Sequence, residues 1–346
     1  LFGMDNRHRR QIKDEDLSRL KGITEITQSD DILSEMPVPQ KPLADMLRKM
    51  NKSFLLSGNN VEIITDFQTM SDRLIADIEG ARHHINMLFF KFEDDAAGRR
   101  IADALIRKSE EGVQVRLIYD DAGNLMVPRR FYRKLRKHGI QVRGFIRIFL
   151  PILSRDYNSR NHRKVVVIDG RVGYMGGMNI AQRYAEGLKW GIWRDTHMRI
   201  TGPAVSELQT SFLTDWKFTK GDEPDLDPMY PYNPPCGNTL MQIVTGGPMD
   251  KWNVMMQAYM TAIASARHHA YLQSPYFIPP EPIMKTLQNA ALSGVDVRVM
   301  IPYRGDKGVL PPWASRSYFK EALNAGIRIY LYRKGYMHAK TMTIDD

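Results

Sequence analysis

The feature that most constrains this 346-residue chain is an internal duplication. Residues 162–169 carry a histidine, a lysine and an aspartate in the spacing His-x-Lys-x4-Asp, and residues 338–345 repeat all three at the same spacing. The text before each motif is duplicated too, since Ala-Arg-His-His occurs at 81–84 and again at 266–269. A repeat that keeps its internal order predicts two similar halves, each ending in the same motif.

Strand-like and helix-like segments alternate within the halves. In the first half the pattern predicts strands at 61–64, 85–92, 113–119 and 140–142, and helices at 70–80, 96–111 and 128–138. Alternation of this kind is typical of an α/β layered fold. The β-branched run within the first motif, residues 165–168, predicts a strand on which His162 and Lys164 share one face while Arg163 points to the other.

The organisation along the chain follows from composition. A Pro-, Gly- and Asp-rich stretch predicts a linker at 221–237, between a first half at 51–220 and a second half at 238–346. Residues 1–50 are charged and broken by prolines, which is typical of a juxtamembrane basic segment and linker. The first half also holds an apolar insertion, 145–153, which is either an edge strand with its loop or an apolar rim that contacts lipid.

The ends of the chain predict a fragment. It starts without methionine at Leu1, and it stops at Asp346 before any counterpart of the Gly-Gly-Met-Asn at 176–179. No run of eighteen apolar residues is present, so we expect no membrane span within this sequence. The formal net charge of +10 indicates an anionic partner, either lipid headgroups or nucleic acid. The single cysteine, Cys236, excludes an internal disulfide.

The duplicated motif and its neighbours resemble the phospholipase D superfamily, and in particular the bacterial cardiolipin synthases. The resemblance rests on residues 160–164, 193–197, 274–279 and 338–341, and it extends from about residue 59 to the end. It implies a duplicated phospholipase D-like fold with the active site at the interface of two α/β halves. It also implies a chain that lacks N-terminal membrane spans and the C-terminal end of its second half.

The implied reaction is phosphatidyl transfer between two phosphatidylglycerol molecules, giving cardiolipin and glycerol through a phosphohistidine. One neutral imidazole attacks phosphorus and a second, protonated one supplies a proton to the leaving alcohol. We assign the nucleophile to His162 and the acid/base role to His338, with the exchanged assignment left open. Lys164 and Lys340 would stabilise phosphoryl charge with help from Asn179, and no metal or cofactor is implied.

The acidic residues are expected to orient a histidine or to hold the motif strands. The resemblance implies that Asp195 orients His162, and that the equivalent partner of His338 lies beyond residue 346. Asp169 and Asp345 complete the catalytic motifs, although in this superfamily the motif aspartate commonly ties the strand end to nearby backbone.

Two further features keep alternative interpretations. The paired histidines at 83–84 and 268–269 could hold a metal, but we favour an interaction with the preceding helix dipole. Tyr276 either lines the mouth of the site or is a buried aromatic residue.

Other functions remain open at this stage. The chain could be a lipid hydrolase or a nuclease of the phospholipase D type, or a non-catalytic membrane-binding module. The synthase interpretation predicts phosphatidylglycerol and a membrane surface as partners, no nucleic acid, and the cytoplasmic side of the bacterial inner membrane. It leaves the oligomeric state open.

Overall fold

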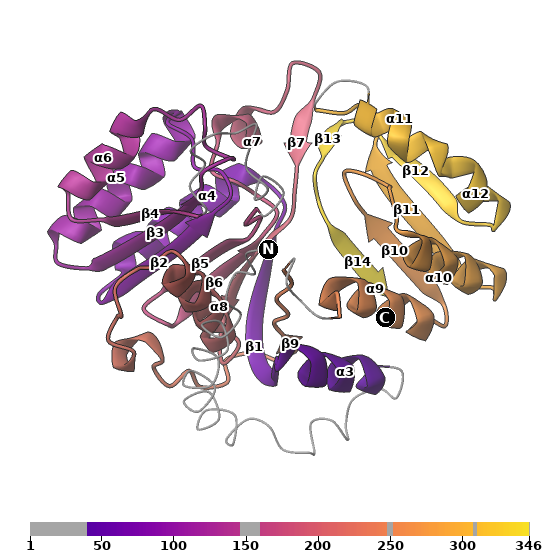
Figure 1. The fold of residues 1–346 in the computed structure, drawn as a ribbon, viewed down its shortest axis with the longest axis horizontal. Coiled ribbons are helices and arrows are strands. Elements are labelled where there is room, and N and C mark those ends of the chain that lie inside the picture. Colours follow the sequence, from indigo (N-terminus) through magenta and orange to yellow (C-terminus); the bar gives the residue numbers. More distant parts are fainter. Residues whose placement is uncertain (1–39, 146–159, 248–251, 307–309, 346) are drawn as a thin grey trace, which may run out of the picture. The chain divides into compact units, whose positions relative to one another are not determined.

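The computed structural model describes residues 40–145, 160–247, 252–306 and 310–345 (Figure 1). The described residues form two compact units, and the segments of these units alternate along the chain. Unit 1 comprises residues 54–182 and 197–243, and unit 2 comprises residues 40–53, 183–196 and 244–345. The predicted basic segment, apart from its last eleven residues, and the predicted apolar rim, apart from Phe145, lie outside the described residues.

Unit 1 is built on one eight-stranded sheet with the order β4-β3-β2-β5-β6-β8-β1-β9. Strands β2, β3 and β4 pair in parallel, and every other pairing is antiparallel. The strands are β1 (Leu55–Ile64), β2 (His84–Phe89), β3 (Gln114–Asp120), β4 (Gln141–Phe145), β5 (Lys164–Ile168), β6 (Val172–Gly176), β8 (His197–Thr201) and β9 (Thr239–Gln242).

Helices cover the sheet of unit 1 and begin where the sequence supplies a cap. The side chain of Asp66 accepts the N–H of Thr69 at the start of α4, and Asp95 accepts that of Gly98 at the start of α5. The helices are α4 (Phe67–Gly80), α5 (Ala96–Glu110), α6 (Arg129–Lys137) and α8 (Val205–Phe218), with a short 3-10 turn, η2 (Asp227–Met229). These elements confirm the strand and helix pattern predicted for the first half.

Helix α8 fills the core on one face of this sheet. Val165 and Val167 of β5 pack in one cluster with Val205 and Leu208 of α8. The two valines share a face because successive side chains of a strand point to opposite faces. A second cluster packs Trp216 of α8, 1% exposed, against strands β2, β3 and β4. The predicted linker also packs on this unit, because Met229 is buried in that same cluster.

Unit 2 repeats the strand order of the first half on a smaller scale. Its four-stranded sheet has the order β12-β11-β10-β14, with β10, β11 and β12 parallel and β14 antiparallel to β10. A separate two-stranded sheet pairs β13 with β7 in parallel. The strands are β7 (Ile192–Arg194), β10 (His269–Gln273), β11 (Asp296–Pro302), β12 (Arg328–Tyr332), β13 (Gly335–Met337) and β14 (Thr341–Ile344).

The helices of unit 2 include one from far upstream. Helix α3 packs against α9, and Asn51 at the end of α3 exchanges two hydrogen bonds with the backbone of Thr245. The helices are α3 (Lys41–Asn51), α9 (Val254–Ser265), α10 (Glu281–Leu292), α11 (Leu310–Ser317) and α12 (Phe319–Asn324). The short α7 (Gln182–Glu186) starts at the last residue of a unit 1 segment, and its other residues belong to unit 2. Among the described residues, no helix is both long and apolar enough to cross a bilayer.

The motif aspartates make the same contact in both units. The carboxylate of Asp169 accepts the backbone N–H groups of Arg82, His83 and His84 at 2.7–2.9 Å. The carboxylate of Asp345 accepts those of residues 267–269 at 2.8–2.9 Å. This contact ties the end of the motif strand to the start of the neighbouring strand, as the structural interpretation of these aspartates predicts.

The same contact explains the repeated Ala-Arg-His-His. Its backbone, and not its imidazoles, is what the motif aspartate binds. The side chain of His84 is 1% exposed, and burial lowers its pKa to about 4, so it is neutral at pH 7. A neutral ring gains nothing from a helix C-terminus, so the expectation that this histidine serves the helix dipole is wrong for His84.

Candidate active site

The imidazole of His162 stands on an aromatic platform just before β5. Its ring stacks on Phe90, with 3.9 Å between centroids and 21° between planes. Phe90 follows the last residue of β2, a strand that pairs with β5. The exposed His162 therefore has one ring face covered by a residue that the buried sheet fixes in place.

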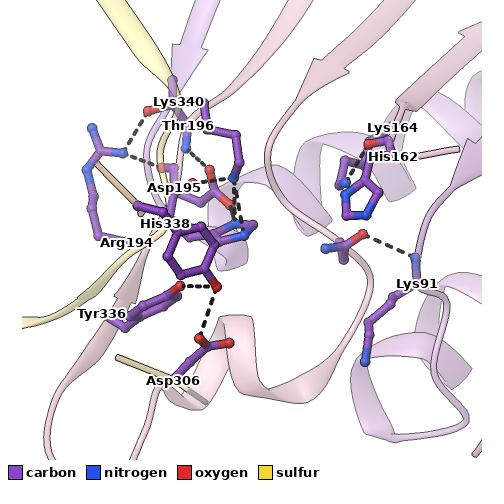
Figure 2. A network of polar contacts seen from close by, with 12 residues as sticks. Lys91, His162, Lys164, Arg194, Asp195, Thr196, Asp306, Tyr336, His338 and Lys340 are labelled. Carbon is purple, nitrogen blue, oxygen red and sulfur yellow. Dashed lines mark hydrogen bonds and ion pairs between the residues drawn. The ribbon is translucent and has the colours of Figure 1, made fainter. Parts of the chain in front are cut away.

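Lys164 lies behind this histidine and is buried, with 6% of the residue exposed. Its ammonium donates to the carbonyl oxygen of His162 at 2.6 Å and lies 5.4 Å from the centre of the Phe90 ring (Figure 2). Asn179 is also buried, and its side-chain oxygen accepts the N–H of Lys91 at 3.1 Å. The structure thus brings His162, Lys164 and Asn179 to the same end of β2.

The residues on either side of His162 are anchored to α8. The carboxylate of Asp215, which is 1% exposed, accepts from the side chain of Asn161 at 2.9 Å and from the guanidinium of Arg163 at 2.7 Å. The N–H of Asn161 also donates to Asp120 at 3.0 Å. Arg163 therefore points to the helix side of the sheet, away from Lys164, as the strand pattern predicts.

The second motif has its own buried carboxylate. Nδ1 of His338 lies 2.7 Å from Oδ2 of Asp195, and Asp195 is 1% exposed (Figure 2). The other oxygen of Asp195 accepts the N–H of Thr196 at 2.8 Å. A carboxylate accepts hydrogen bonds only, so the ring must carry its proton on Nδ1 and present Nε2 for chemistry.

This pairing corrects two expectations. The expectation that Asp195 orients His162 is wrong, because the histidine ring bonded to this carboxylate is that of His338. The expectation that the partner of His338 lies beyond residue 346 is wrong for the same reason. The physical cause is strand pairing: β7 runs parallel to β13 with Arg194 opposite Met337, and the N–H of His338 donates to the carbonyl of Arg194 at 2.7 Å.

Lys340 lies directly on the His338 ring. Its ammonium is 3.2 Å from Nε2 and 3.3 Å from Nδ1, and it donates to the carbonyl oxygen of His338 at 2.7 Å. Both lysines thus donate to the carbonyl of the histidine two residues earlier. Each motif therefore places a lysine ammonium on the backbone of its histidine, so that a positive charge and an imidazole lie close together.

Aromatic residues surround the second histidine. Trp193, Tyr336 and Tyr184 have ring centres 5.7, 5.9 and 6.3 Å from that of His338. The hydroxyl of Tyr336 donates to that of Tyr276 at 3.1 Å, and Tyr276 in turn donates to Asp306 at 3.3 Å. Burial raises the pKa of Tyr336, which keeps it a neutral donor. Tyr276 is 37% exposed, so it is not the fully buried aromatic of the alternative interpretation.

Sequence reasoning missed several residues that support the motifs. Phe90 and Asp215 were not among the candidates, although both hold the His162 segment. The available signal for Asp215 was its place next to Trp216 and Phe212 on a helix face with large apolar residues, where an acidic side chain is expected to need a partner. Among the described residues, no cluster of three or more His, Cys, Asp or Glu side chains could hold a metal ion.

Comparison with known proteins assigns the fold to a family. Residues 74–216 and 259–346 match the family described as "Cardiolipin synthase, PLD-like domain". The chain belongs to this family. The two matched segments each contain one His-x-Lys-x4-Asp motif, which confirms the predicted superfamily and the duplicated phospholipase D-like architecture.

Curated relatives agree with the family assignment. The chain is 39% identical over 310 residues to the major cardiolipin synthase ClsA of Bacillus subtilis (strain 168), covering 88% of this chain and 64% of the relative. It is 41% identical over 297 residues to the cardiolipin synthase of Listeria monocytogenes serotype 4a (strain HCC23), covering 85% and 61%. The chain therefore spans less than two thirds of the length of these relatives.

A solved structure supports the fold at greater distance. The phosphatidylserine synthase of Haemophilus influenzae Rd KW20 superposes with a TM-score of 0.63 at 15% sequence identity. The superposition covers 89% of this chain and 80% of that protein. At this identity the likeness concerns the fold alone.

Proposed function

We propose that this chain carries the catalytic part of a cardiolipin synthase, which moves a phosphatidyl group from one phosphatidylglycerol to another and releases glycerol. The observation that carries the proposal is the match to curated cardiolipin synthases at about 40% identity over a stretch that contains both motifs. An anionic lipid substrate also suits the formal net charge of +10. The bacterial inner membrane, on its cytoplasmic side, is the proposed location.

The first half-reaction needs a nucleophile and a proton donor. We propose that His162 attacks phosphorus, so that a P–N bond forms as the bond from phosphorus to the glycerol headgroup oxygen breaks. His338 delivers the proton that this oxygen needs to leave as glycerol. Stacking on Phe90 holds the plane of the His162 ring in position for this attack.

The second half-reaction reverses the proton transfer. A glycerol hydroxyl of the second phosphatidylglycerol attacks phosphorus and gives its proton to His338, and the P–N bond breaks. The buried carboxylate of Asp195 supports both directions, because it fixes the ring tautomer and stabilises the imidazolium that forms. Asp195 is thus a positioning residue that acts through His338.

The lysines would stabilise the charge that develops on the phosphoryl oxygens. Each of Lys164 and Lys340 places its ammonium on the carbonyl oxygen of its motif histidine. The Asn179 side chain has its oxygen bonded to Lys91, which fixes the amide for donation to an oxyanion. Asp169 and Asp345 are assigned to holding the motif strands, through the backbone contacts described above.

The test uses vesicles of phosphatidylglycerol as the only phospholipid, with cardiolipin and free glycerol measured together. The proposal predicts the two products in equal amounts, and their loss in His162→Ala and in His338→Ala. Arg82→Ala is a matched control, because Arg82 contributes only its backbone N–H to the Asp169 contact. Phosphatidic acid without cardiolipin would make water the acceptor and the protein a lipid hydrolase. Unchanged lipid would reject the proposal.

A further inference from the structure

The loop between β3 and α6 presents two large apolar side chains to water. Leu125 is 54% exposed and Met126 is 95% exposed. Single exposed apolar residues are common on protein surfaces, but two in succession at a loop tip, directly before a charged helix, are the arrangement found at lipid-contacting surfaces.

The loop holds these side chains outward because its other half is firmly anchored. Asn124, which is 5% exposed, donates to the carbonyl oxygens of Phe90 at 2.8 Å and Asp120 at 2.7 Å, and accepts the N–H of Phe92 at 2.8 Å. Asp120 accepts the N–H of Gly123 at 3.0 Å. The exposure of Leu125 and Met126 is therefore fixed by hydrogen bonds within unit 1.

Helix α6 continues the loop with a basic face. Its apolar side buries Phe131, Tyr132 and Leu135 against unit 1. Six exposed cations lie on this helix, Arg129, Arg130, Arg133, Lys134, Arg136 and Lys137. Within the described residues, Lys134 forms an ion pair with Asp103 at 3.1 Å, and the guanidinium of Arg136 donates to the carbonyl oxygen of Val142. The other four cations lack a carboxylate partner among the residues that the structure describes.

The same loop is hydrogen-bonded to the support of His162. Asn124 binds the backbone of Phe90, whose ring stacks on the His162 imidazole. The second oxygen of Asp120 accepts the N–H of Asn161, the residue before His162. A lipid surface that engages this loop would therefore lie against the segment that positions the proposed nucleophile.

We propose that residues 121–128 and helix α6 form a docking surface for a bilayer rich in anionic lipid. Leu125 and Met126 enter the boundary between headgroups and acyl chains, and the basic face of α6 binds lipid phosphates. This inference rests on the proposed function in one respect, since it names the surface by which the same site reaches its lipid substrate. Charge complementarity identifies anionic headgroups as the occupant, because four exposed cations of α6 have no carboxylate partner within the described part of the chain.

The test measures vesicle binding by sedimentation, a readout that does not depend on catalysis. Wild type, Leu125→Ser/Met126→Ser and Arg130→Gln/Lys137→Gln are compared on vesicles of equal phosphatidylglycerol and phosphatidylcholine, and on phosphatidylcholine alone. Ile63→Ser is the matched control, because Ile63 is also an exposed apolar residue of unit 1, at 67%. Its neighbour is the acidic Glu62 and not a basic helix. Far-UV circular dichroism and thermal unfolding establish that each variant is folded.

The docking surface predicts specific differences. Replacing both apolar residues weakens binding to the anionic vesicles at least about tenfold. Removing two cations weakens it by roughly fivefold for each, about twenty-five-fold in all, and flattens its salt dependence. Ile63→Ser binds as wild type does, and phosphatidylcholine alone is bound weakly by every protein.

Other results would overturn the inference. Wild-type affinity in the Leu125→Ser/Met126→Ser variant would do so, as would equal weakening in Ile63→Ser. Single-stranded DNA bound by wild type and lost in the charge variant, with vesicle binding unchanged throughout, would assign α6 to nucleic acid instead. If the wild-type protein binds the anionic vesicles through this surface but makes no cardiolipin, the proposed function is rejected and the docking surface stands.

Discussion

Replacing Asp345 by asparagine tests whether the motif aspartate holds the fold or takes part in the chemistry. Its carboxylate accepts three backbone N–H groups from residues 267–269, and its own N–H donates to the carbonyl of His269 at 3.1 Å. Asp345 has a backbone φ of 47°, in the left-handed region that asparagine tolerates well. The substitution therefore removes the charge and one acceptor oxygen without straining the backbone.

The magnitude follows from the pKa. Hydrogen bonds from the backbone of residues 267–269 lower the pKa of Asp345 from 3.8 to about 2. A difference of this size corresponds to about 2.5 kcal/mol for a fully buried group. Because Asp345 is only partly buried, screening by water reduces the expected loss of stability to about 1–2 kcal/mol.

The pH dependence has a definite sign. The folded-state pKa lies below the unfolded value, so the contribution of Asp345 is fully present at neutral pH and is lost as the pH falls. The stability difference between wild type and Asp345→Asn should be constant above about pH 5 and should fall to about half by about pH 3.

Hydrogen exchange of β10 and β14 amides during urea unfolding measures this difference within unit 2. Transfer activity per folded molecule is measured in parallel on phosphatidylglycerol vesicles, and we expect most of it to be retained. Equal stability of the two proteins across this pH range would refute the proposed role of the carboxylate. A stable but inactive variant would place Asp345 in the chemistry.

Three further predictions concern single buried side chains, those of His84, Asp195 and Lys164. Burial lowers the pKa of His84 to about 4, so the free energy of unfolding of unit 1 should fall by about 3 kcal/mol as the pH falls from 6.5 to 4. Hydrogen exchange should show that this pH dependence is absent in His84→Leu. Asp195→Asn should slow transfer about a hundredfold or more, while vesicle binding and thermal unfolding stay unchanged; a slowing below about threefold would contradict the role of Asp195 in positioning His338. Lys164→Met should lower kcat by about a hundredfold and leave KM within about threefold, and a pure KM effect would show that this ammonium binds the ground state only.

The sequence was informative wherever the signal was local or repeated. The duplicated motif predicted the architecture, because each copy follows the same series of strands and helices. The alternation of strand-like and helix-like segments placed β2 and β3, and the intervening α5 begins at its capping residue Asp95. The opposite directions of Lys164 and Arg163 followed from strand periodicity alone.

The errors came from contacts that no local pattern encodes. The segment 183–196 belongs to unit 2, where β7 pairs with β13, and this pairing brings Asp195 to His338, 143 residues downstream. The family resemblance had suggested His162 as the partner of Asp195. In the same way, the repeated Ala-Arg-His-His suggested a role for its histidine side chains. In the structure both copies donate three backbone N–H groups to a motif aspartate. A backbone contact of this kind can be made by almost any residue, so it leaves no residue-specific signal in the sequence.

Trapping the covalent intermediate tests the central claim most directly. The protein is mixed with phosphatidylglycerol vesicles, quenched in alkali within one turnover, digested and examined by mass spectrometry for a phosphatidyl group on histidine. The account predicts this group on His162 and none in His162→Ala. Its occupancy should be higher in Asp195→Asn if proton transfer from the second lipid to His338 limits turnover. Cardiolipin formation with no modified histidine would contradict the account, and modification of His338 in place of His162 would contradict the assignment of the two roles.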